Sequence, residues 1–192
     1  LSIGWSNDWL DAARDRAVER SDKPAARGDV AVPVVRTAAF VALAAALLLT
    51  LPLGLGALAA VVVAIAGGWA YNLGLKSTVY SWVPFAVSFG ILPAIATLGQ
   101  EQPAFPQWWV YAAGALLGVA AHVTNVLPDL DDDARTGISG LPHRLGPRVS
   151  GLLAFAALAV ATLVITFGPG LPVRPLLIAG LGCIAVPLGD SF

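Results

Sequence analysis

Residues 37–75 read TAAFVALAAALLLTLPLGLGALAAVVVAIAGGWAYNLGL, and none of these 39 side chains is charged. An uncharged turn, Leu51–Gly56, interrupts the run near its middle with one proline and two glycines. The parts around it, Thr37–Leu55 and Leu58–Leu75, are each about as long as an α-helix must be to cross a ~30 Å hydrocarbon core. The stretch therefore predicts two membrane-spanning helices.

The rest of the chain continues this pattern. Hydrophobic residues make up 57% of the 192 residues, charged residues make up 12%, and the mean hydropathy is +0.78. Such a composition excludes an ordinary soluble enzyme and a disordered chain. Further apolar segments of spanning length are Val79–Leu98, Trp108–Val126, Val149–Phe167 and Pro175–Leu188. We expect an all-α, polytopic transmembrane bundle, because six such helices would leave a soluble protein without polar faces.

The few charged residues are concentrated in two polar segments. Of the 23 charges, twelve fall in residues 8–36 and seven in residues 129–148, while residues 37–128 carry only Lys76 and Glu101. If each apolar segment crosses the membrane once, both polar segments and Lys76 lie on the same side of the membrane. That side then carries ten of the eleven lysines and arginines. Positive residues favour the cytoplasmic face, so we expect a plasma-membrane protein with both segments cytoplasmic. The net charge of −1 gives no reason to expect a nucleic-acid partner.

Both polar segments contain the pattern N-x-x-x-D-x-x-x-D. An offset of 118 residues relates Asn7 to Asn125, Asp11 to Asp129, Asp15 to Asp133, Pro24 to Pro142, and Gly28 to Gly146. A spacing of four places side chains on one face of a helix, one turn apart. We therefore expect a parallel internal repeat, and structural repeats in membrane proteins form binding sites where they meet.

The chemistry of the pattern points to a divalent cation. Two such helix faces would bring several carboxylates around one cavity, where they repel unless a cation lies between them. Oxygen ligands without histidine or cysteine favour Mg²⁺ or Ca²⁺, and Mg²⁺ commonly bridges carboxylates to phosphates. We expect a two-site Mg²⁺ cluster that holds a diphosphate. The alternative is that the acids are solvated charges near membrane exits; Asp131 and Asp132, which lie off the repeated face, are expected to be solvated or outside the ligand set.

Basic residues accompany the acids. The first polar segment contains Arg14, Arg16, Arg20, Lys23 and Arg27, and the second contains Arg135, Arg144 and Arg148. Lys76 follows Tyr71 and Asn72 at the end of an apolar segment, where a lysine either extends to the membrane surface or belongs to the acidic site. His122 is either a base facing the cavity or a hydrogen-bonded residue of the bundle, and His143 is expected to be structural or solvated.

These residues resemble the motifs of the UbiA superfamily of intramembrane prenyltransferases. Residues 7–15, with Arg20, Lys23, Pro24 and Gly28, are similar to its first aspartate-rich motif. Residues 125–137, with Gly146, are similar to the second, and residues 71–76 to its Tyr…Lys segment. The motifs look closest to those of the menaquinone and chlorophyll synthase branches. The resemblance covers the whole chain, as one domain (1–192) with two cytoplasmic aspartate-rich loops, 7–36 and 125–148.

The resemblance implies a fold of nine transmembrane helices around a central cavity. About six to seven are expected here, so we expect the chain to be truncated at both ends. It also implies Mg²⁺-dependent transfer of a polyprenyl group from its diphosphate to a small, commonly aromatic acceptor within the bilayer. A cation-binding transporter or carrier is the alternative, although its charges would be expected near the bilayer midplane.

The resemblance also implies roles for individual residues. The expected catalytic residues are Asp8, Asp11, Asp129, Asp133 and Lys76. The expected metal ligands are Asp8, Asp11, Asp15, Asp129 and Asp133. The expected contacts to the diphosphate end of the substrate come from Asn7, Arg20, Lys23, Asn125 and Tyr71.

Overall fold

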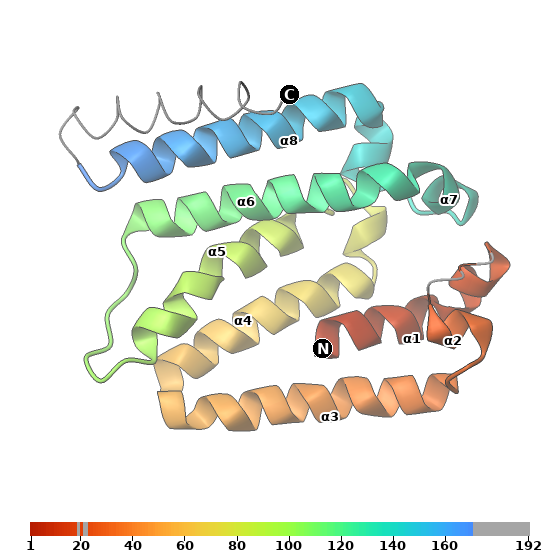
Figure 1. The fold of residues 1–192 in the computed structure, drawn as a ribbon, viewed down its shortest axis with the longest axis horizontal. Helices are drawn as coiled ribbons and strands as arrows, with labels where there is room; N and C mark the ends of the chain where they lie inside the picture. Colours follow the sequence, from red (N-terminus) through yellow and green to blue (C-terminus); the bar gives the residue numbers. More distant parts are fainter. Residues whose placement is uncertain (19, 21–22, 171–192) are drawn as a thin grey trace, which may run out of the picture.

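The computed structural model describes residues 1–18, 20 and 23–170, and in this part of the chain the regular structure is helical (Figure 1). The α-helices are α1 (Ser2–Ala17), α2 (Pro24–Arg27), α3 (Val32–Thr50), α4 (Leu55–Asn72), α5 (Val83–Leu98), α6 (Trp108–Val126), α7 (Leu130–Arg135) and α8 (Leu141–Phe167). The 3₁₀ turns are η1 (Leu51–Leu53), η2 (Leu75–Ser77) and η3 (Leu127–Asp129). The predicted all-α fold is confirmed.

Within the described residues, four helical segments are long and apolar enough to cross a membrane: Val32–Leu53, Leu55–Asn72, Trp108–Arg135 and Leu141–Phe167. α5 is also apolar but has only 16 residues. α6 matches its predicted bounds at Trp108 and Val126. The sixth predicted segment, Pro175–Leu188, lies outside the described residues.

Three predicted helix starts were too late along the chain and one was too early. α4 begins at Leu55 rather than Leu58, and α5 begins at Val83 rather than Val79. α3 begins at Val32 rather than Thr37, and α8 begins at Leu141 rather than Val149. In both helices a proline occupies the first turn, where its missing N–H costs nothing because that position has no helical acceptor. The predicted segments begin directly after the charged residues Arg36 and Arg148, whereas both helices begin before them, because hydropathy marks only the uncharged part of a helix.

The repeat predicted from the sequence is visible in the backbone. α2 begins at Pro24 and ends at Arg27, directly before Gly28, which has φ +84°. The first turn of α8 contains Pro142 and is interrupted at Gly146, which has φ +75°. Glycine adopts positive φ without the steric cost that a Cβ adds, so the same residue type terminates the turn in both copies.

Close backbone contacts hold the central helices together. α5 packs along both α4 and α6, and α8 packs on the other side of α6, while α1 lies against α3 and α4 (Figure 1). A Cβ at Gly118 would lie 2.3 Å from the carbonyl oxygen of Phe85, and one at Gly114 would lie 2.6 Å from that of Phe89. Small residues permit such approaches in membranes, where water supplies no driving force between helices.

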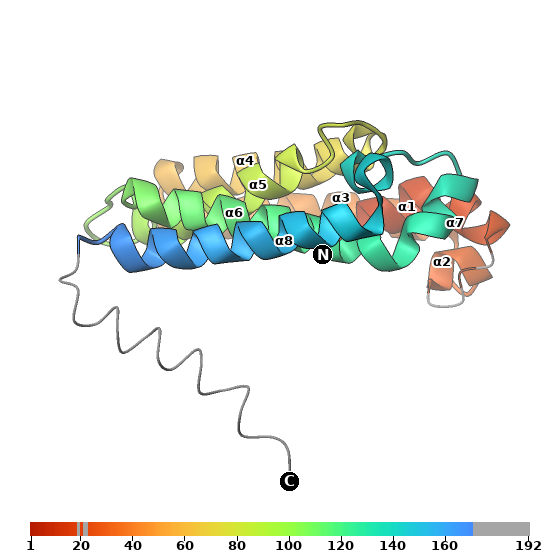
Figure 2. The same cartoon turned by 90° about the horizontal axis from the view of Figure 1, so that it is seen from above.

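The polar segments gather at one end of the bundle. Figures 1 and 2 show α2 and α7 beyond the long helices at this end, next to the C-terminal half of α1. The fold therefore brings the two copies of the repeat together although 118 residues separate them.

The contact between α5 and α6 predicts the effect of one added methyl group. Gly118→Ala should lower the free energy of unfolding by about 1–3 kcal/mol, because the backbones must separate. The matched control is Gly151→Ala on α8, where nothing lies within 4 Å of the added Cβ. Thermal unfolding in detergent measures both; equal melting temperatures for the two variants would contradict the packing described here.

Candidate active site

The first motif presents one face of α1 to the interior. Asn7, Asp11 and Asp15 follow at intervals of four, and both aspartates are only 5% exposed. The side-chain amide of Asn7 donates a hydrogen bond to Oδ2 of Asp11 at 2.7 Å. Nζ of Lys23 donates to Oδ1 of Asn7 at 2.8 Å, so the residue before α2 closes over this face.

The end of α4 anchors α1 and supplies a cation. The amide of Asn72 donates to the carbonyl oxygen of Ile3 at 2.9 Å and to Oγ of Ser6 at 2.8 Å. Lys76, in η2, is 8% exposed and forms an ion pair with Oδ1 of Asp11. The side chain thus belongs to the acidic site and does not extend to a membrane surface.

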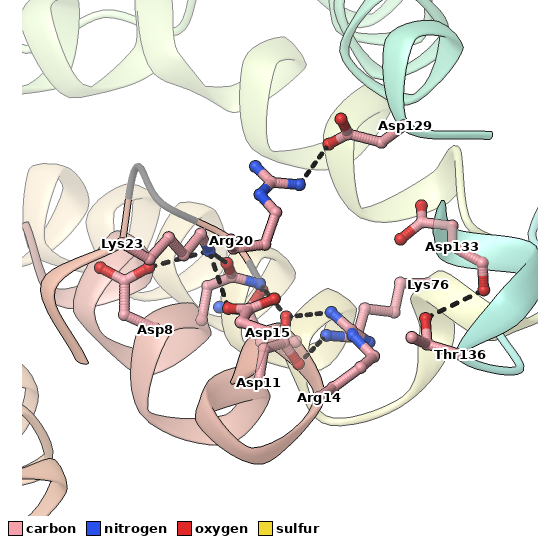
Figure 3. A network of polar contacts seen from close by, with 12 residues as sticks. Asp8, Asp11, Arg14, Asp15, Arg20, Lys23, Lys76, Asp129, Asp133 and Thr136 are labelled. Atoms are coloured by element: carbon pink, nitrogen blue, oxygen red, sulfur yellow. Dashed lines mark hydrogen bonds and ion pairs between the residues drawn. The ribbon is translucent and has the colours of Figure 1, made fainter. Parts of the chain in front are cut away.

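The second motif lies opposite. Asn125 is on α6, Asp129 in η3 and Asp133 on α7. Figure 3 shows Asp129 and Asp133 facing the carboxylates of α1, with Arg20 between the two groups. Nη1 of Arg20 lies 3.2 Å from Oδ2 of Asp129, which joins the two copies of the repeat directly.

Both motifs line one cavity of about 370 Å³. Ten of the eleven site residues predicted from the sequence belong to its wall: Asn7, Asp11, Asp15, Arg20, Lys23, Tyr71, Lys76, Asn125, Asp129 and Asp133. Its apolar wall comes from α1, α4 and α5 and includes Ile3, Gly68, Pro84, Phe85 and Phe89. The cavity therefore joins a charged part to an aromatic, apolar part.

Asp8 is the predicted site residue that the wall does not include. Its carboxylate lies 2.9 Å from Nζ of Lys23, and it is one residue removed from the Asn7/Asp11/Asp15 face. Asp8 therefore contacts Lys23, a residue of the cavity wall, but does not line the cavity itself.

The sequence reasoning missed several residues of the site. Asp132 lines the cavity together with Asp129 and Asp133. Its i,i+3 spacing from Asp129 permits this, because residues three apart lie on the same side of a helix. Arg14, which the sequence analysis named only among the basic residues of the first polar segment, also lines the cavity. It pairs with Asp11 at 2.5 Å, a contact that their i,i+3 spacing permits. The side chain of His143 is 8% exposed and its Nε2 lies 3.5 Å from Oδ2 of Asp133, a contact that no sequence pattern indicated.

The charges in the wall nearly balance. Five carboxylates (Asp11, Asp15, Asp129, Asp132 and Asp133) face four cationic side chains (Arg14, Arg20, Lys23 and Lys76). Burial opposes the charged form of Lys23, but its hydrogen bond to Asp8 and the nearby charges of Asp15, Asp8 and Asp11 outweigh it and raise the pKa of this lysine. For Lys76, burial dominates and lowers the pKa, although the hydrogen bond and charge of Asp11 oppose the change.

The donor set suits a hard divalent cation. In the described residues, no three histidine, cysteine, aspartate or glutamate side chains form a ready-made metal cluster. The wall offers oxygen donors, however, and the buried Oδ2 of Asp15 accepts no hydrogen bond, lying 3.5 Å from the Lys23 ammonium. Carboxylate oxygens without sulfur or imidazole are the ligands that Mg²⁺ prefers.

Comparison with known proteins agrees with the motifs. The family model of the UbiA prenyltransferase family matches residues 1–191. The chain belongs to this family. The multi-pass membrane character predicted from the sequence follows from this membership together with the apolar helices. No solved structure matches the chain.

One relative with a named activity is a 4-hydroxybenzoate octaprenyltransferase of Ralstonia nicotianae (strain ATCC BAA-1114 / GMI1000). It is 31% identical to this chain over 135 residues, which are 69% of the chain and 46% of the relative. The chain thus matches about half the length of that relative. The resemblance to the menaquinone and chlorophyll synthase branches stays a prediction.

The ion pairs of Lys23 predict a pH-dependent contribution to stability. Folding raises the pKa of Lys23, so its ion pairs stabilise the folded state fully below pH 10.5, the ordinary pKa of lysine. This stabilisation is lost as the pH rises through the pKa that Lys23 has in the folded state. Lys23→Met should therefore lower the free energy of unfolding by about 1 kcal/mol at neutral pH, and by progressively less above the folded pKa. Chemical denaturation at several pH values measures this.

Arg135→Met is the control, because this arginine is 74% exposed and does not line the cavity. A Lys23→Met deficit that is as large at high pH as at neutral pH would contradict the role given to the lysine charge.

Proposed function

We propose that this family member transfers a polyprenyl group from a prenyl diphosphate to a small aromatic acceptor, with Mg²⁺, inside the bilayer. The observation that carries the proposal is the single cavity in which two aspartate motifs and four cations lie next to an aromatic, apolar wall. A prenyl diphosphate has the same division, with a polyanion at one end and a hydrocarbon chain at the other.

The cavity suggests how the donor would lie. The diphosphate would occupy the charged part, within reach of Lys76, Arg20 and Lys23. Asn7 and Asn125, one from each copy of the repeat, would donate hydrogen bonds to its oxygens. The prenyl chain would extend along Phe85 and Phe89, whose rings are 6.2 Å apart and stacked.

The charge balance supports a metal requirement. The cations of the wall are already paired with carboxylates, so a bound diphosphate would leave several negative charges uncompensated. Asp11 and Asp15 on one side and Asp129 and Asp133 on the other would hold Mg²⁺, while Asp8 would orient Lys23. When bound, Mg²⁺ would neutralise charge on the diphosphate and make it a better leaving group.

The protein's own residues would then assist the bond change. The bond between C1 of the prenyl group and the diphosphate oxygen breaks, and its electron pair stays with the oxygen. Lys76 and Arg20 would stabilise the charge that develops there. The ring of Tyr71, which contacts Phe85 edge-on at 5.1 Å, would face the allylic cation. A carbon of the acceptor bonds to C1 and releases its proton.

The acceptor class rests on the relative named above, whose acceptor is 4-hydroxybenzoate. An aromatic ring fits the aromatic wall by stacking, so we extend the class, though not the compound, to this chain.

We also propose a plasma-membrane location with both aspartate-rich segments cytoplasmic, because ten of the eleven lysines and arginines lie on that side of the predicted topology. The polar segments that carry the acids lie at one end of the bundle (Figure 1). A transporter would be expected to bind its cation near the middle of the bilayer, so this position favours the enzyme over a transporter.

Loss of one carboxylate from either motif tests the proposal. Asp11→Asn and Asp129→Asn should each reduce turnover by about 100-fold or more, because each removes a negative charge from the shared cavity. Product mass and diphosphate release are measured with full-length protein in membranes, a panel of prenyl diphosphates and aromatic acceptors, and Mg²⁺ or a chelator.

Asp29→Asn is the matched control, because this aspartate is exposed and pairs with Arg27 away from the cavity. Wild-type rates in both motif variants, or turnover that persists in the chelator, would overturn the metal-dependent mechanism. An absence of turnover by the wild type with every pair would overturn the enzymatic proposal itself.

A further inference from the structure

A buried polar contact behind the cavity has no role in the mechanism above. His122, on α6, is 1% exposed, and its Nε2 lies 3.0 Å from Oγ of Ser81, which is completely buried. The same Oγ accepts a hydrogen bond from the backbone N–H of Leu141, the first residue of α8, at 2.9 Å. Ser81 thus connects α6, which carries Asn125 of the second motif, to the start of α8.

Ser81 is in turn connected to Lys76 through the backbone. The N–H of Ser81 donates to the carbonyl of Thr78 at 3.1 Å, and the N–H of Thr78 donates to that of Leu75 at 3.0 Å. These consecutive turns leave little freedom between the serine and the lysine, so a displacement of Ser81 is transmitted to η2.

A second contact reaches the lysine directly. A Cβ at Gly140 would lie 2.6 Å from the carbonyl oxygen of Lys76 and 2.9 Å from Oγ of Ser81. The backbone before α8 therefore lies against the backbone of Lys76. Such a close approach requires glycine at position 140.

We propose that three positioning residues hold the backbone of Lys76: His122, Ser81 and Gly140. The ammonium of Lys76 then reaches the first motif, while the main chain of Lys76 is fixed by the second half of the molecule. Lys76 pairs with Asp11 on α1, whereas His122 and Gly140 lie on α6 and before α8. The arrangement makes the position of one cation depend on both copies of the repeat.

His122 is suited to this role by its surroundings. Its ring lies 5.7 Å from that of Tyr71 and 5.0 Å from that of Phe85, both in the cavity wall, but the histidine itself is not part of the wall. Of its two ring nitrogens, Nε2 contacts Ser81 and Nδ1 is buried without a hydrogen-bond partner. The imidazole therefore holds Ser81 through one polar contact while its faces pack against the aromatic rings.

Chemical labelling of lysine tests the positioning without any activity measurement. The chain contains only two lysines, Lys23 and Lys76, so each protein carries an internal reference. In the full-length protein, an amine-reactive ester should label Lys76 about five times faster in His122→Phe and Gly140→Ala than in wild type, with Lys23 unchanged, because a released lysine opens to solvent. Mass spectrometry of the labelled peptides measures both sites.

Two controls separate positioning from general loss of structure. His122→Gln retains a side-chain amide that can contact Ser81 and should restore most of the protection of Lys76. Gly151→Ala adds the same methyl group as Gly140→Ala at an open position and should leave labelling unchanged. Equal labelling of Lys76 in wild type, His122→Phe and Gly140→Ala would overturn the inference, as would parallel increases at Lys23.

A double-mutant cycle tests the consequence for catalysis, which rests on the proposed function. His122→Phe should lower kcat about 10-fold with little change in KM for the prenyl diphosphate, since Lys76 acts on charge that develops as the bond breaks. In a Lys76→Met background the same substitution should change kcat less than about 2-fold, because residues acting through one group are not additive.

The possible failures are distinguishable. Equal losses in both backgrounds would show that His122 does not act through Lys76, while the prenyl-transfer proposal would stand. If the wild type is inactive but His122→Phe still exposes Lys76 to labelling, the proposed function is overturned and the positioning of the lysine is supported.

Discussion

The ion pair between Asp11 and Lys76 joins the parts of the site that the chain keeps far apart. Asp11 comes from the polar helix α1, and Lys76 from the turn after α4, so their contact connects the first motif to the centre of the bundle. Removing Asp11 would leave the buried Lys76 ammonium without its carboxylate partner, which costs more than the intact pair contributes. Asn72 supports the same junction by donating two hydrogen bonds to the first turns of α1.

The charge pattern around this pair explains how the cavity can exist before substrate binds. Five carboxylates in one wall would repel strongly, but four cationic side chains lie among them, and Arg20 bridges towards Asp129. The arrangement is close to neutral, and a polyanionic ligand would disturb that balance. The proposed need for Mg²⁺ follows from this balance, and the apolar wall accounts for a donor with a hydrocarbon chain.

Much of the fold and the site followed from periodicity. Apolar runs gave the spanning helices because hydrocarbon thickness fixes their length, and the four-residue spacing placed Asn7, Asp11 and Asp15 on one helix face. The errors were of two kinds. Asp132 lines the wall because residues three apart also share a helix side, and Asp8, one position off the α1 face, contacts Lys23. The helices α3 and α8 begin before Arg36 and Arg148, the charged residues after which the predicted apolar segments began.

The sequence by itself determined the class of fold, the two motifs and their common offset of 118, because these are properties of residue type and spacing along one chain. Only the tertiary structure decided which charges meet. Lys76 could equally have extended to the membrane surface, and His143 carried no pattern that linked it to Asp133. Contacts between residues far apart in the chain depend on how helices pack. Close glycine approaches such as those at Gly114 and Gly118 contribute to that packing. Their four-residue spacing places both on one face of α6, but the spacing does not say which helix meets that face.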